Sequence, residues 1–340
     1  MTMFNFGKGG SVPAHRHQNP NGFEGGWVAD TAHVADTAHV GPEARVFGQA
    51  QVGGQARVYG RAHVFDQARV LDQARVFGQA QVYGQAQVFG CSPHISGKAQ
   101  VYGQAQVSGE AQVFGLAQVY DRAHVYDEAQ VFGQAQVFGQ AQVSGQTFIY
   151  GRAQVSGEAC VFDRAQVSGE ARVFGSTRVS GEARVLGYAE VWGQAQIYGE
   201  AQVSGEARVC DEAQVRGQAQ VYGYAEVWGQ AQVSGEARVS GSTSVSGTSK
   251  VSDSILCLGT YKDIECDQTP DVISLKRSLA IVAKDRVIIG EQHKTLEEWD
   301  RDPPPDWDRL RPVVVLMLPR PPPIEGTHYL DQLIGPNDYI

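Results

Sequence analysis

The 340-residue sequence has little of several features that mark common classes of protein. Its five cysteines are few, odd in number and scattered, which does not form a disulfide framework and suits a reducing compartment. No run of 18 apolar residues occurs, so we expect no membrane span. The net charge of −9 argues against a nucleic-acid partner, because phosphates attract a basic face. The N-terminus lacks the apolar segment of a secretory signal, and together these absences lead us to expect a cytoplasmic protein.

Most of the chain consists of one six-residue repeat, or hexad, Ala-x-Val-x-Gly-x. Its aliphatic residue, the anchor, recurs every six positions from Val28 to Val88 and, after one inserted residue, from Ile95 to Val251, which gives 38 repeats. Ala and Val stand two apart and therefore point to the same side of a strand. A six-residue unit cannot bury its valine face alone, so we predict that the chain coils and that each turn stacks on the next.

The glycine of each hexad indicates a corner that needs a left-handed backbone conformation. Aspartate, which also visits that conformation, is the usual replacement. It occurs at eight corners: Asp30, Asp36, Asp66, Asp72, Asp121, Asp127, Asp163 and Asp211.

An inward aliphatic residue with a small residue four places later, as in Val82–Ala86 and Val101–Ala105, resembles the hexapeptide-repeat superfamily of trimeric LpxA-like proteins. The resemblance covers roughly residues 27–252. It implies an all-β fold, a single-stranded left-handed parallel β-helix in the form of a triangular solenoid. With three hexads, or 18 residues, per coil, we expect about 12–13 coils. The hand is implied by the resemblance alone, since crossover connections in general prefer the right hand.

The two ends of the repeat region resemble a narrower group of bacterial and phage hexapeptide proteins akin to YdcK, commonly given an acyltransferase label or left uncharacterised. The resemblance rests on "GGWVADTAHV" and "RVIIGEQHKTLEEWD". Because an open coil is an adhesive sheet edge, we expect a cap at each end. The second segment predicts a small α+β cap, with a hairpin turn at Lys284–Arg286 and a helix capped by Thr295. We divide the chain into an irregular N-terminal cap (1–26), the solenoid (27–252), the C-terminal cap (253–300) and a mobile Pro-rich tail (301–340).

The superfamily resemblance implies an acyl-CoA-dependent acyltransferase in which a histidine acts as general base beside a loop excursion. The one excursion here is a single residue within Cys91–His94, which makes His94 the catalytic candidate. A general base needs a pocket and an orienting partner, and a smooth prism offers neither. We therefore favour the interpretation of His94 as a solvated corner residue, and we expect no cofactor unless the enzymatic alternative holds.

Four histidines stand in the outward position before an anchor valine: His33, His39, His63 and His124. The superfamily's carbonic anhydrases use three histidines, and zinc needs ligands that converge at about 2 Å. Here only His33 and His124 fall on the same face, five coils apart, so they cannot share a metal.

His15 and His17 are the remaining metal candidates, as half of a site. Two histidines in an N-terminal segment more often bind nothing, and we expect no metal. Cys257 and Cys266 could pair or bind a metal, but free thiols are the interpretation that we prefer.

Sorting the residues that follow every third anchor separates three faces of the prism. On one face nine of eleven such positions are aromatic, against four and six of eleven on the others. The nine are Phe47, Phe65, Tyr83, Tyr102, Tyr120, Phe138, Phe174, Trp192 and Trp228. A row of glutamines, Gln81 to Gln154, runs beside them and could hydrogen-bond along the axis.

An exposed apolar stripe normally marks an interface. We therefore predict a non-catalytic structural or interaction protein that presents this face for association into a homo-oligomer or for ligand binding. A polysaccharide ligand and an acyltransferase are the alternatives, and rows that only stabilise the rod remain a further interpretation.

Overall fold

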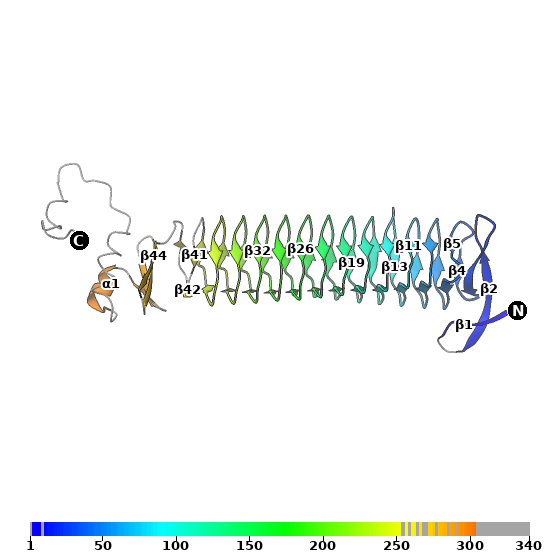
Figure 1. Ribbon diagram of the computed structural model, residues 1–340, viewed down its shortest axis with the longest axis horizontal. Coiled ribbons are helices and arrows are strands. Elements are labelled where there is room, and N and C mark those ends of the chain that lie inside the picture. The colour runs from blue at the N-terminus through cyan, green and yellow to red at the C-terminus, as the bar shows by residue number, and fades with distance from the viewer. Residues whose placement is uncertain are drawn as a thin grey trace. The chain divides into compact units, whose positions relative to one another are not determined.

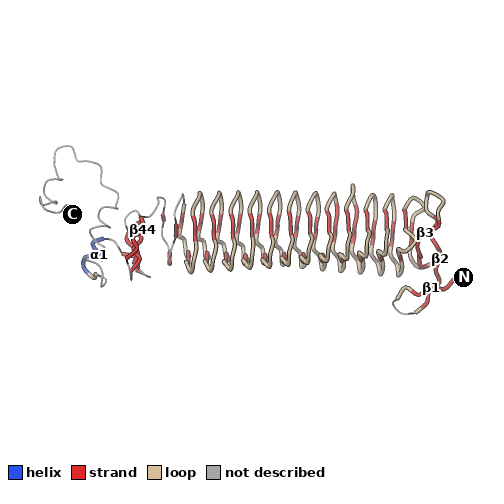
Figure 2. Tube along the Cα trace, in the orientation of Figure 1, coloured by secondary structure: helices blue, strands red, loops and turns tan. Residues whose placement is uncertain are grey.

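A computed structural model divides the chain into two compact units, residues 1–269 and residues 270–340. It describes residues 2–7, 10–252 and 297–303 with their side chains, and the strands between 256 and 294 by their backbone alone. The first unit is a rod of stacked coils with strands on its faces and turns at its corners (Figures 1 and 2). The predicted parallel β-solenoid is confirmed, and the hand of its winding stays a prediction from the resemblance.

Each hexad forms a two-residue strand made of the anchor and the residue before it. The three strands of one coil belong to three different parallel sheets, A, B and C, and every third strand pairs in register. Val82, for example, lies between Val64 and Val101 of the neighbouring coils.

Sheet A contains β3 (Glu24–Ala29), β6 (Arg45–Val46), β9 (His63–Val64), β12 (Gln81–Val82), β15 (Gln100–Val101), β18 (Gln118–Val119), β21 (Gln136–Val137), β24 (Gln154–Val155), β27 (Arg172–Val173), β30 (Glu190–Val191), β33 (Arg208–Val209), β36 (Glu226–Val227) and β39 (Ser244–Ser246). Sheet B contains β4 (His33–Val34), β7 (Gln51–Val52), β10 (Arg69–Val70), β13 (Gln87–Phe89), β16 (Gln106–Ser108), β19 (His124–Val125), β22 (Gln142–Val143), β25 (Cys160–Val161), β28 (Arg178–Val179), β31 (Gln196–Ile197), β34 (Gln214–Val215), β37 (Gln232–Val233) and β40 (Lys250–Val251). Sheet C contains β5 (His39–Val40), β8 (Arg57–Val58), β11 (Arg75–Val76), β14 (His94–Ile95), β17 (Gln112–Val113), β20 (Gln130–Val131), β23 (Phe148–Ile149), β26 (Gln166–Val167), β29 (Arg184–Val185), β32 (Gln202–Val203), β35 (Gln220–Val221) and β38 (Arg238–Val239).

The core of the rod is a column of aliphatic anchors and alanines. The anchors from Val40 to Val251 are fully buried, as are the alanines between them. Six of the eight corner aspartates adopt the predicted left-handed conformation, with φ between 57° and 63°. Asp30 and Asp36, in the first coil, are not among the left-handed residues.

The N-terminal segment is not irregular, so that prediction is wrong. β1 (Thr2–Asn5), β2 (Ser11–Gln18) and β3 pair in antiparallel fashion and extend sheet A. A polar side chain in the turn after β2 pairs with β5, the edge strand of sheet C. The Asn19 side chain accepts a hydrogen bond from the Val40 N–H at 2.8 Å and donates one to the Val40 carbonyl at 3.1 Å. The physical reason is that an open coil presents unpaired backbone groups, which an added strand and a polar side chain satisfy.

Parallel pairing continues beyond residue 252, where we had placed the end of the solenoid. The strands β41 (Leu256–Cys257), β42 (Thr260–Lys262) and β43 (Glu265–Cys266) add to sheets C, A and B. That boundary was too early, because the ladder is built from backbone N–H and C=O groups and does not require the Ala-x-Val pattern. The side chains of Cys257 and Cys266 lie outside the described residues.

The second unit contains an antiparallel sheet in the order β44 (Asp271–Leu275), β45 (Ser278–Ala283), β46 (Arg286–Ile289) and β47 (Gln292–Lys294), followed by α1 (Leu296–Arg301). The predicted hairpin is confirmed by the pairing of Ala283 with Arg286. The predicted helix begins directly after Thr295, and residue 295 and the tail from 304 onward lie outside the described residues. No helix in the described part of the chain is long and apolar enough to cross a membrane.

Candidate binding surface

Sheet A carries a continuous stack of six aromatic rings, which we call the sheet A aromatic row. Consecutive ring centroids lie 4.8–4.9 Å apart and the rings are within 4° of parallel. The stack arises because each ring follows an anchor that pairs in register with the anchor of the next coil. The members are Phe47, Phe65, Tyr83, Tyr102, Tyr120 and Phe138.

The other three predicted aromatic residues lie on sheet A as expected but do not continue this stack. Ser156 interrupts it, and Phe174 and Trp192 form a separate stacked pair at 5.9 Å. Trp228, beyond Cys210, is 41% exposed. The sequence therefore predicted the face correctly, while the breaks follow from single non-aromatic residues in the row.

The N-terminal hairpin covers the start of the sheet A aromatic row. Phe6 stacks on Phe47 with 4.9 Å between ring centroids, and Phe4 stacks on Trp27 at 4.3 Å. As a result Phe47 is 9% exposed and Phe65 only 1%. The prediction that these two residues belong to an exposed face is wrong, because Phe4 and Phe6 fall in a segment that we took to be irregular.

From Tyr83 to Phe138 the row is half-buried, and Tyr83 packs against the cluster that contains Phe6, Phe47 and Phe65. Burial raises the pKa of the hydroxyls of Tyr83, Tyr102 and Tyr120, and the nearby carboxylates Asp66 and Asp121 raise it further. The hydroxyls therefore stay protonated and able to donate. Tyr83 donates to Gln100 Oε1 at 3.4 Å.

The glutamine hydrogen bonds along the axis lie at a corner rather than on the sheet A strands. Gln85 donates to Gln67 at 3.3 Å and Gln104 donates to Gln85 at 3.1 Å. The predicted ladder from Gln81 to Gln154 shows no such bond between its members in the described structure.

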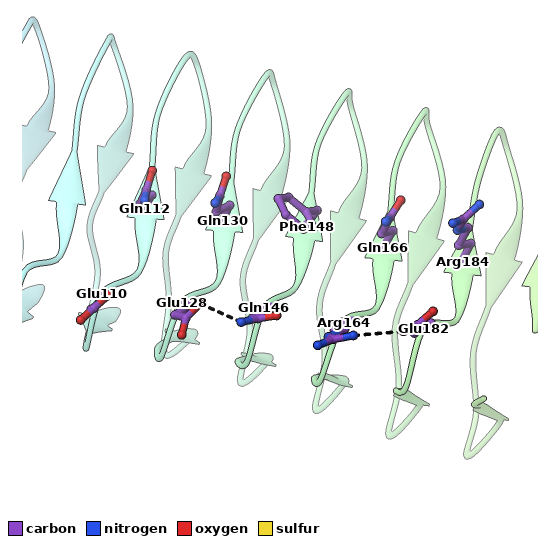
Figure 3. A pocket seen from close by; sticks show the side chains of 10 residues that line it. All are labelled: Glu110, Gln112, Glu128, Gln130, Gln146, Phe148, Arg164, Gln166, Glu182 and Arg184. Carbon is purple, nitrogen blue, oxygen red and sulfur yellow. Dashed lines mark hydrogen bonds and ion pairs between the residues drawn. The ribbon is translucent and has the colours of Figure 1, made fainter. Parts of the chain in front are cut away.

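Two shallow grooves follow the axis of the rod. The first lies over sheet C, has a volume of about 390 Å³, and is shown in Figure 3. Two parallel rows line it, the corner residues Glu110, Glu128, Gln146, Arg164 and Glu182 and the strand residues Gln112, Gln130, Phe148, Gln166 and Arg184. The corner side chains bind one another along the axis, with Gln146 donating to Glu128 at 3.0 Å and Arg164 to Glu182 at 3.3 Å.

The second groove lies over sheet A near its C-terminal end and has a volume of about 480 Å³. Its floor is an alternating row of arginine and glutamate on β27, β30, β33 and β36. Neighbours in this row are 3.3–3.9 Å apart, so each charge has an opposite charge one coil away.

His94 lies in β14, beside the one-residue insertion. Its Nε2 is 3.4 Å from the hydroxyl of Ser92, and its ring meets the edge of Phe77. Burial lowers the pKa of His94, and the Arg75 charge lowers it further. In the described residues no carboxylate hydrogen-bonds to this ring, so a neutral base is present without an orienting acid.

The other histidines lie where the register placed them, with His33 and His124 on sheet B, His39 on sheet C and His63 on sheet A. Of the N-terminal pair, His15 contacts Asp30 at 2.9 Å, and the buried His17 hydrogen-bonds to the Ala38 carbonyl at 3.0 Å. Across the residues that the structure describes, no group of three or more His, Cys, Asp or Glu side chains is placed to hold a metal.

A family model described as YdcK Beta solenoid repeat matches residues 165–181 and 231–247. The first match begins at β26 in sheet C and the second at β37 in sheet B. This chain is a β-solenoid repeat protein. The similarity concerns the coil repeat and no particular surface of the solenoid, since the two segments begin on different faces. No curated protein matches the chain.

Proposed function

We propose that this solenoid is a non-catalytic rod that associates with a second copy of itself through the half-buried part of the sheet A aromatic row, Tyr83 to Phe138. The observation that supports this most is the stack of rings that the chain covers at one end with its own phenylalanines and leaves half-exposed beyond. Contiguous exposed aromatic surface of this kind is typical of an interface.

The axial spacing of the rings favours a second copy as the partner. A surface can meet every ring of the row only if it repeats at the same 4.8–4.9 Å interval. A second copy of this protein has the same interval between its rings. Isologous pairing, in which both copies use the same patch, is the commonest form of homo-oligomer.

The charges beside the row also permit self-association despite the net charge of −9. The neighbouring strand positions are neutral glutamines from Gln81 to Gln136, and the corner beyond carries the opposite charges of Asp121 and Arg122. Two copies can therefore approach here without repulsion between like charges.

Sedimentation equilibrium tests this proposal. We expect the wild-type protein to form a dimer, and the variant carrying Tyr102→Arg and Tyr120→Arg to be a monomer with unchanged strand content by circular dichroism. The control is Tyr126→Arg on sheet B, which follows Tyr120 by one hexad but has serines, Ser108 and Ser144, one coil away on either side. A wild-type monomer at the highest soluble concentration would refute the proposal.

An acyltransferase is the second candidate, on the observation that Ser92 and His94 lie within 3.4 Å of each other. Binding of acyl-CoA would raise the melting temperature of the native protein. On our proposal acyl-CoA leaves it unchanged, whereas a saturable rise that is lost in His94→Ala would favour the enzyme.

A further inference from the structure

A five-residue phrase, Tyr-Ala-Glu-Val-Trp, occurs twice on sheet A, as Tyr188–Trp192 and Tyr224–Trp228. Tyr, Glu and Trp stand two apart, so all three point outward while Ala and Val point into the core. Each phrase thus sets an aromatic ring on either side of a carboxylate. The strands β30 and β36 that carry them are separated by β33 alone, so the two Tyr-Glu-Trp clamps stand two coils apart, roughly 9.6 Å at the usual strand spacing.

The tyrosine of each clamp lines the groove over sheet A, where Tyr188 and Tyr224 alternate with Glu170 and Glu206 on the corner row. Tyr188 is 60% and Tyr224 63% exposed. The tryptophans are not part of this lining, and the indole N–H of Trp228 donates to the Ser244 hydroxyl at 3.1 Å. The large exposed tyrosine rings are positioned to contact a ligand.

The floor of the groove is polar and close to neutral. Glu190 lies 3.5 Å from Arg172 and 3.9 Å from Arg208, and Arg208 lies 3.3 Å from Glu226. Exposed ion pairs of this kind are weak, so their guanidinium and carboxylate groups remain available to donate to and accept from a ligand. With Glu170 and Glu206 on the corner row, the lining has four glutamates against two arginines, so an anionic polymer is repelled here.

Two exposed tyrosine rings beside a floor of hydrogen-bonding groups match the surface of a pyranose sugar, which has C–H faces and a rim of hydroxyls. The coils continue beyond both ends of the groove, so a chain can enter and leave along the axis. A linear glycan that presents the same ring face at every second sugar fits clamps that recur at every second coil. The groove over sheet C is similar in volume but has no aromatic side chain on its corner row, so it lacks the clamp (Figure 3).

We infer that the groove lined by Tyr188 and Tyr224 binds a linear neutral polysaccharide with β-1,4 linkages. The clamps hold alternate sugar rings, and Glu190, Arg208 and Glu226 hydrogen-bond to the hydroxyls. This site lies on a different part of sheet A from Tyr83–Phe138 and does not require self-association.

Isothermal titration calorimetry with cellohexaose, chitohexaose and xylohexaose, and with the helical α-1,4-linked maltohexaose for comparison, tests this inference. At least one of the first three should bind the wild-type protein, with a change in tryptophan fluorescence, and maltohexaose should bind on the order of tenfold more weakly. Failure of all three to bind, or equal binding of maltohexaose, would overturn the inference.

Substitution separates the clamps from the rest of the surface. Tyr188→Ala combined with Tyr224→Ala should weaken binding by on the order of tenfold, because two stacking surfaces are lost. Leu116→Ala is the matched control, since Leu116 is 49% exposed on the same corner row four coils before Tyr188. It should bind like the wild-type protein, and a clamp variant that also did so would contradict the assignment.

The same titration on the Tyr102→Arg, Tyr120→Arg variant distinguishes this site from the proposed self-association. Binding should persist there whether or not the wild-type protein is a dimer. Loss of binding in that variant would place the glycan on the aromatic row and overturn the assignment to the groove.

Discussion

The aspartates at the corners of the rod show how a single residue can connect two coils. Asp121 has φ of 57°, and its Oδ2 accepts a hydrogen bond from the backbone N–H of Gly139, one coil further on, at 3.2 Å. All six left-handed aspartates make this bond, at 2.9–3.2 Å, and in every case the donor is a glycine. The aspartate thus adds an acceptor to a corner that glycine could form alone.

Substitution of Asp121 separates the backbone effect from the hydrogen bond. Asp121→Gly loses the bond to Gly139 and removes the Cβ from the left-handed backbone, whereas Asp121→Ala loses the bond and keeps a Cβ there without the polar side chain that lets aspartate adopt this conformation. We expect the alanine variant to have a free energy of unfolding about 1 kcal/mol lower than the glycine variant, with both below the wild type, by urea denaturation. Equal stability of the two variants would show that the corner imposes no strain on alanine.

The tyrosines of the sheet A aromatic row predict a loss of stability at high pH. Burial raises the pKa of Tyr83, Tyr102 and Tyr120 above the ordinary value of 10.0, so the folded state holds these protons more tightly than the unfolded state. The stabilisation is complete below pH 10 and is lost as the pH rises through the higher pKa of the folded protein.

Absorbance of tyrosinate should therefore show a group of late-ionising hydroxyls, and the melting temperature should fall over the same range of pH. Replacement of the three tyrosines by phenylalanine should remove both effects. A wild-type titration without a late-ionising fraction would contradict this prediction.

The N-terminal hairpin is the element that decides where the solenoid begins and which rings it exposes. It places Phe4 and Phe6 over the start of the aromatic row and brings Asn19 to the edge strand of sheet C. Both contacts satisfy a surface that the first coil would otherwise leave open, as capping repeats do in other solenoids.

Asn19→Ala tests this capping role. The Val40 N–H loses its acceptor, so its amide hydrogen exchange should accelerate by about five- to tenfold, while that of Val125 in the middle of the rod stays unchanged. Asn21→Ala is the control, because Asn21 hydrogen-bonds only to Phe23 within the same loop. Unchanged exchange at Val40 in the Asn19 variant would show that the edge is protected by other contacts.

At the scale of the whole molecule, the rod is a series of interchangeable coils. The sheet to which a hexad belongs depends on the number of hexads that precede it. Removal of 18 residues removes one coil and leaves every later hexad on its own sheet. Removal of six residues keeps the hexad pattern but moves every later hexad to the next sheet, which replaces the rings after Tyr102 by those of sheet B.

Deletion of residues 103–120 and deletion of residues 103–108 test this. Both proteins should fold with unchanged strand content, because the coils on either side of the deletions bury the same Ala and Val positions. The 18-residue deletion should retain self-association in sedimentation equilibrium, whereas the six-residue deletion should lose it. Equal association of the two would show that the aromatic row is not the interface.

The sequence alone determined that the chain coils and stacks turn on turn, because inward Ala and Val repeated at a strict period of six can be buried only in this way. The number of three hexads per coil was implied by the superfamily resemblance, and with it the period gave the face on which each aromatic residue lies. The left-handed corners were predictable for the same reason, since Gly or Asp recurs at one position of the hexad.

Only the tertiary structure decided which rings are covered and where the solenoid ends. Phe6 reaches Phe47 and Asn19 reaches Val40 through contacts between unlike positions of the sequence. Strands β41 to β43 pair without the repeat, through backbone groups that leave no pattern in the side chains. A period predicts contacts between like positions, and contacts between unlike positions require the folded chain.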